Sequence, residues 1–84
     1  MLFRSKDAEA GIEETPRTDE QKAEIAEVRR VYEARLAQEE VMHHSRLATL
    51  GEATLREAAD AAYHRERERL VEERDRKIER IRRR

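Results

Sequence analysis

One glycine, Gly51, separates two long stretches of sequence that both carry the apolar spacing of a helix. A glycine just past an apolar run is typical of the left-handed residue that ends many helices. Thr54 follows three residues later and Glu57 three residues beyond it, which is the spacing of a capping box at the start of a helix. A helix end followed within about four residues by a helix start is the connection of an antiparallel helical hairpin. The sequence therefore predicts a fold-back at residues 51–54.

The rival interpretation is one continuous helix, because a glycine inside a helix costs only about 1 kcal/mol. The two apolar stripes favour the hairpin. If the chain folds back near residue 53, residues equally far from it on either side face each other, and apolar residues then meet apolar residues. The predicted facing pairs are Ile25 with Ile81, Val28 with Ile78, Leu36 with Leu70, and Leu47 with Ala59, while Leu50 meets Leu55 one residue out of register.

Composition supports a purely helical fold. Charged residues make up 46% of the chain, aromatic residues only 4%, and no stretch alternates as a strand would. Such a composition with helical spacing is typical of coiled coils and long helices. Thr18 and Gln21 have the spacing of a second capping box, directly after Pro16. The predicted fold is all-α: an antiparallel, coiled-coil-like hairpin with a first helix at about 19–50, a turn at 51–54 and a second helix at about 55–82, preceded by a disordered or extended segment at 1–17.

The apolar stripes are thin, and a chain of this size rarely forms a sufficient core from two helices alone. We therefore expect the hairpin to pack against something else, either a second copy in a four-helix bundle or a larger host protein. The expected function is that of a helical protein–protein interaction module, as a homo-oligomer or as a small accessory or regulatory subunit. The predicted interface residues are Ile25, Val28, Tyr32, Leu36, Leu47, Leu50, Leu55, Tyr63, Leu70, Ile78 and Ile81.

Several classes of function lack their motifs in this sequence. It has no glycine-rich phosphate loop, nucleophile elbow, zinc-finger spacing or serine triad, so no enzymatic activity is expected. It has no cysteine and no segment that reads as a signal peptide or a membrane span, so the expected compartment is the cytoplasm. Its net charge of −1 lacks the basic excess of a nucleic-acid-binding protein.

Glu40 and His43 form a Glu-x-x-His motif on the inward face of the first predicted helix. In the predicted register, Glu66 lies opposite Glu40 and Tyr63 lies opposite His43. Two copies of the hairpin would combine these residues into a set that resembles the ferritin-like di-iron carboxylate site. The resemblance implies a metal site of Glu40, His43 and Glu66, with iron or manganese as cofactor and a metal-dependent oxidase activity. The alternative is a polar layer in the seam, the line along which the two helices meet. This layer fixes the register of the helices, with His43 hydrogen-bonded to Glu40 or Tyr63.

The two ends of the chain suggest further contacts. Arg80, Arg82, Arg83 and Arg84 lie at the carboxyl end and could bind phosphates of a nucleic acid or another polyanion. Acidic residues are interleaved through 66–79, and no aromatic side chain there offers a stacking surface. At the other end, residues 1–17 read either as a frayed terminus or as a short docking peptide carried by residues 1–3.

Overall fold

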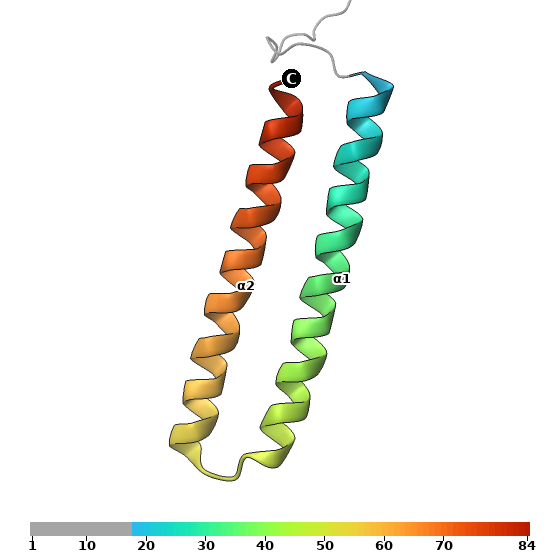
Figure 1. The fold of residues 1–84 in the computed structure, drawn as a ribbon. Coiled ribbons are helices and arrows are strands. Elements are labelled where there is room, and N and C mark those ends of the chain that lie inside the picture. The colour runs from blue at the N-terminus through green and yellow to red at the C-terminus, as the bar shows by residue number, and fades with distance from the viewer. Residues whose placement is uncertain (1–17) are drawn as a thin grey trace, which may run out of the picture.

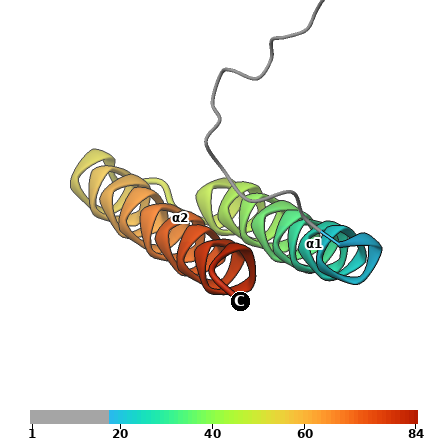
Figure 2. The same ribbon diagram turned by 90° about the horizontal axis from the view of Figure 1, so that it is seen from above.

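Two long helices lie side by side in opposite directions and form a single layer (Figures 1 and 2). The structure is a computed structural model that describes residues 18–84. Helix α1 spans Asp19–Thr49 and helix α2 spans Ala53–Arg82, and there is no strand within the described residues. The all-α hairpin is therefore confirmed, and the rival single helix is wrong. The expectations for residues 1–17 lie outside the described residues.

The amino end of α1 is capped as its sequence predicts. The Thr18 side chain accepts a hydrogen bond from the backbone N–H of Gln21, and the Gln21 side chain accepts one from the backbone N–H of Thr18, both at 3.0 Å. Two of the backbone donors that a helix leaves unpaired at its start are thereby satisfied. Asp19 and Glu20 follow in the first turn, where negative charge complements the helix dipole.

The turn forms at the predicted place but by another device. Leu50 ends α1 in an extended conformation, and Gly51 adopts no left-handed φ. The Arg56 guanidinium reaches back from α2 and donates hydrogen bonds to the carbonyl oxygens of Leu47 at 2.6 Å and Leu50 at 3.0 Å. These oxygens belong to the last turn of α1 and its cap, where helix carbonyls lack partners and attract positive charge. Arg56 therefore caps the carboxyl end of α1, the role that the sequence analysis assigned to Gly51.

The predicted capping box at the start of α2 is wrong. The helix begins at Ala53, with Glu52 as its capping residue and no side-chain hydrogen bond at the cap. Thr54 consequently lies inside the first turn of α2 rather than in the position before it. Helix α2 thus starts at Ala53, earlier than the predicted residue 55, and leaves a shorter connection than the sequence suggested.

The apolar seam is densest at the open end of the hairpin, far from the turn. Ile25, Ile78 and Ile81 form a buried cluster, and Val28 packs against it. The predicted meeting of Ile25 and Val28 with the two isoleucines of α2 is therefore confirmed. Polar contacts close the same end: Gln21 Nε2 donates to the carbonyl oxygen of Ile81 at 2.9 Å. Arg84 pairs with Glu24 at 2.7 Å. The buried apolar residues along the whole seam are Ile25, Tyr32, Ala59, Leu70, Ile78 and Ile81.

Candidate functional site

A buried histidine ties the two helices together in the half of the hairpin nearer the turn. His43 of α1 is 7% exposed, and its Nε2 lies 2.7 Å from Oδ1 of Asp60 on α2. Its imidazole stacks on the ring of Tyr63, with 4.3 Å between ring centroids and an interplanar angle of 2°. The other ring nitrogen, Nδ1, is buried without a hydrogen-bond partner among residues 18–84. Tyr63 thus faces His43 as the register predicts, and the pair lies inside the seam.

The alternative in which His43 bonds to Glu40 or Tyr63 is wrong in its partners, because the carboxylate comes from Asp60. The sequence did carry a signal for this residue. Asp60 precedes Tyr63 by three positions, so the two side chains share one face of α2. A carboxylate beside the aromatic residue that faces a histidine is a natural acceptor for its ring N–H. The polar layer itself, the other half of that alternative, is present at this level of the seam.

The predicted metal-binding residues have separate roles within one hairpin. Glu40 is exposed, and Glu66 pairs with Arg69, whose Nη2 lies 2.6 Å from its Oε2. The hydrogen bond from Arg69 lowers the pKa of Glu66, and Coulombic attraction acts in the same direction. Residues 18–84 contain no group of three or more His, Cys, Asp or Glu side chains placed to hold a metal ion. The ferritin-like site was predicted across two copies, and in that form it stays a prediction.

Most of the predicted interface residues are buried or half-buried within the hairpin itself. Ile25, Tyr32, Leu70, Ile78 and Ile81 are buried, and Val28, Leu36, Leu47, Leu50 and Tyr63 are half-buried in the same seam. Leu55 differs, because 51% of its surface is exposed. Val41 and Met42, which were not among the predicted interface residues, are exposed at 64% and 42%. The large apolar side chains that remain accessible on the described residues therefore all lie in the half of the hairpin nearer the turn.

Met42 and Leu55 lie along the same flank of the hairpin. A cleft midway along this flank is lined by Arg35 and Gln38 of α1 and by Glu66 and Arg69 of α2, among others. Residues four or seven positions apart share a helix face, so Met42 continues the α1 side of the cleft toward the turn. On α2 the same spacing leads from the cleft to Ala62, Ala58 and Leu55. We call Met42, Leu55, Ala58 and Ala62, all exposed, the loop-end patch.

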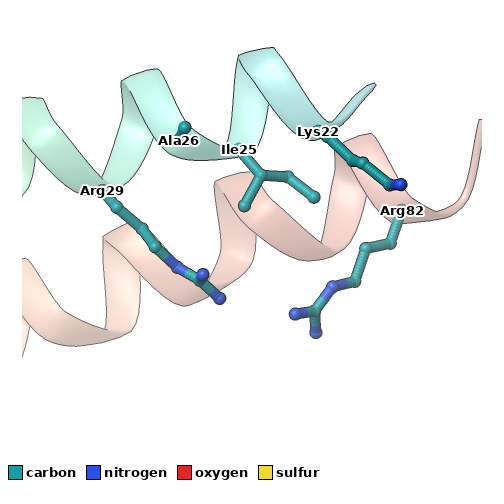
Figure 3. A pocket seen from close by; sticks show the side chains of 5 residues that line it. All are labelled: Lys22, Ile25, Ala26, Arg29 and Arg82. Atoms are coloured by element: carbon teal, nitrogen blue, oxygen red, sulfur yellow. The ribbon is translucent and has the colours of Figure 1, made fainter. Parts of the chain in front are cut away.

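The arginines of the carboxyl end do not present one common surface. Arg83 pairs with Glu79 at 3.1 Å, and Arg84 pairs with Glu24 across the two helices at 2.7 Å. Arg80 is exposed, while Arg82 lines a separate cleft at the open end together with side chains of α1 (Figure 3). Two of the four arginines predicted to bind a polyanion are thus already engaged by carboxylates.

No protein-family model, curated protein or solved structure matches this chain. Neither α1 nor α2, the helices of the described part of the chain, is long and apolar enough to cross a membrane.

Proposed function

We propose that this chain is a non-catalytic helical protein–protein interaction module, which works either as a homo-oligomer or as an accessory subunit on a larger host protein. The observation that carries the proposal is the loop-end patch. Its two large apolar side chains, Met42 and Leu55, remain about half exposed, while the isoleucines at the open end bury one another. Moving such a side chain from full exposure to full burial is worth about 1.5–3 kcal/mol, so the half that is still exposed leaves part of this gain for a partner.

The shape of the patch suits another helix. Leu55, Ala58 and Ala62 recur at spacings of three and four residues, which is how a helix presents anchors to a groove or to a second helix. The two alanines project little beyond the backbone, so a partner helix can approach α2 closely, and helix axes pack about 8–10 Å apart depending on the side chains between them. A second hairpin laid across this flank gives a four-helix bundle, and a helix of a host protein fits the same surface.

Charge confines the contact to the half nearer the turn. Toward the open end the same flank carries Arg69, which pairs with Glu66 and Glu73 at 2.6 and 3.2 Å. Desolvating such charged groups is costly unless the partner satisfies all of them. The exposed apolar side chains of this flank therefore lie near the turn, beside the exposed Arg46, and paired charges lie beyond them, which sets both the position and the limited size of the proposed interface.

Measurement of mass in solution tests the proposal. Sedimentation equilibrium of the full chain, with and without co-purified proteins, is expected to give a mass above the 10.0 kDa of one chain. A double variant of the patch, Met42→Glu with Leu55→Glu, is expected to be monomeric and to lose any co-purified host, because a buried unpaired carboxylate is costly.

The matched control adds the same two charges to exposed alanines outside the patch, Ala23→Glu with Ala34→Glu. It should assemble as the unmodified chain does, and circular dichroism should give equal helix content for both doubles. A chain that is monomeric and alone at every concentration contradicts the proposal. So does a patch variant that assembles normally.

A further inference from the structure

We propose that a cationic groove at the open end of the hairpin binds the acidic segment of the same chain at residues 7–14. The groove is a surface cleft of about 310 Å³. Figure 3 shows Lys22 and Arg29 of α1 and Arg82 of α2 around it, with Ile25 and Ala26 between them. We call these five residues the open-end groove.

The charged side chains that line the groove are all positive, and Glu33 lies beside Arg29 only in the neighbouring cleft. Its lining contains two arginines and one lysine but no carboxylate. None of the three forms an ion pair with another residue of 18–84, whereas Arg30, Arg69, Arg83 and other arginines of the hairpin do. Like charges brought together from two helices repel one another, and an anion between them relieves that repulsion. Because Arg presents a planar fork of donors, the groove suits carboxylates held in fixed positions.

The segment at residues 7–14 has the matching chemistry. It reads Asp-Ala-Glu-Ala-Gly-Ile-Glu-Glu, with four acidic residues and no basic one. Ile12 stands beside a pair of glutamates, as Ile25 stands among the cations of the groove. One apolar contact flanked by ion pairs is therefore available on both surfaces. No other run of eight residues in the sequence has four acids and no basic residue.

Residues 7–14 are joined to α1 by a short linker, which makes the contact possible even though each ion pair is weak. Residue 14 is only four positions before Thr18, where the first turn of α1 begins and from which Lys22 projects. Eight extended residues span up to about 26 Å, more than the roughly 10 Å of helix axis between Lys22 and Arg29. A short linker holds such a segment at an effective concentration on the order of millimolar. Exposed ion pairs that are too weak to recruit a free peptide can then populate a docked state, which an acidic partner must displace.

Paramagnetic relaxation in the full chain tests this contact. The sequence has no cysteine, so Ala10→Cys carries a single nitroxide label within the segment. At low salt the label should broaden the amide signals of Lys22, Ala26, Arg29 and Arg82. In about 1 M salt this broadening should fall at least twofold, because salt screens exposed charges over a few ångströms. Neutralising the segment with Asp7→Asn, Glu9→Gln, Glu13→Gln and Glu14→Gln should have the same effect as salt.

Two double variants separate the groove from general charge attraction. Arg29→Gln with Arg82→Gln removes two positive charges from the groove, and Arg76→Gln with Arg80→Gln removes two from exposed positions outside it. Only the first pair should lower the broadening to the level seen in high salt. Equal effects of the two pairs, or no effect of either, overturn the proposal. Broadening that passes from a labelled chain to an unlabelled, isotope-enriched copy assigns the groove to a second molecule and overturns the intramolecular contact.

Discussion

At the open end of the hairpin, α1 and α2 meet through a cluster of isoleucines, whereas nearer the turn they meet through a histidine, a carboxylate and a tyrosine ring. The open end adds the Gln21–Ile81 hydrogen bond and the Glu24–Arg84 ion pair. The turn end adds the Arg56 contacts to the last carbonyls of α1. Both ends are crossed by specific contacts. The isoleucines of the open end are buried, whereas the half nearer the turn leaves Met42 and Leu55 exposed beside the half-buried Leu47 and Leu50.

This difference shows where the hairpin has apolar surface that it does not bury itself. Where the seam is apolar, the chain uses its large aliphatic side chains to hold itself together. Where the seam is polar, Met42 and Leu55 are left on the surface. Burial of this exposed apolar surface is favourable, and only a partner can bury it. The interaction surface is therefore expected at the end whose own seam contains the fewest buried aliphatic residues.

The largest expected effect distinguishes a buried from an exposed aliphatic residue. Ile78 is 5% exposed within the isoleucine cluster, so Ile78→Ala should lower the free energy of unfolding by about 2–5 kcal/mol. Leu55→Ala removes a side chain that is 51% exposed and should change it by about 0.5 kcal/mol or less. Urea unfolding followed by circular dichroism, at a concentration where the chain is monomeric, compares the two. Equal losses would mean that the apolar seam extends to the turn.

Asp60→Ala tests whether the polar seam stabilises the turn end. It leaves the buried Nε2 of His43 without its acceptor, which should cost about 1–2 kcal/mol in the free energy of unfolding. Asp60→Asn retains an acceptor oxygen and should recover most of this loss. Glu57→Ala, a nearby exposed acid with no ion pair among residues 18–84, serves as the control. If the alanine variants at 57 and 60 are equally stable, the His43–Asp60 contact contributes nothing.

Arg56→Ala should weaken the turn by about 0.5–1.5 kcal/mol, because the carbonyl oxygens of Leu47 and Leu50 lose a charged donor. Gly51→Ala is the matched variant in the same loop. A Cβ at residue 51 meets no atom within 4 Å, and the backbone there is not left-handed. This substitution should be neutral or stabilise by up to about 1 kcal/mol, since it restricts the unfolded chain. Thermal unfolding of both variants tests the assignment, and the opposite order of stabilities would restore glycine as the cap.

The smallest effect concerns Glu66, whose pKa is lowered by its hydrogen bond with Arg69. Since the folded value lies below the ordinary value of 4.5, the pair stabilises the fold above that pH and loses its contribution as pH falls through the lowered value. Both side chains are exposed to solvent, so the change is small. Glu66→Gln should therefore flatten the acid limb of a stability–pH profile slightly. Identical acid limbs for Glu66→Gln and the unmodified chain would contradict the pairing.

The hairpin and its register could be predicted because they follow from spacing along the chain. Two helical stripes on either side of a break have only a few ways to face each other, and the pairing of Ile25 and Val28 with Ile78 and Ile81 is one that the structure confirms. The Thr18 cap was predictable for a similar reason, since both its partners lie within four residues.

The turn and the polar seam were less accessible to sequence reasoning. Arg56 belongs to α2 but caps the carboxyl end of α1. Its role therefore depends on how far a flexible side chain reaches across the turn. The turn uses neither a left-handed glycine nor a Thr54 cap. Asp60 was overlooked because the facing rule pairs positions at one level, whereas a carboxylate three residues away can still bond to His43. Leu55 of the loop-end patch was predicted as an interface residue. Met42 and the two alanines were missed because the expected interface was drawn on the seam, most of which the chain buries within itself.

Hydrogen exchange of backbone amides compares the two ends of the hairpin most directly. Exchange is followed in the full chain from dilute solution to the concentration, or the host complex, in which the mass measurement finds assembly. Amides around Met42 and from Leu55 to Ala62 are predicted to gain protection on assembly, while those around Ile25 and Ile78 stay as they were. Protection that rises instead at the isoleucine end, or at neither end, would contradict the assignment of the interface to the loop-end patch.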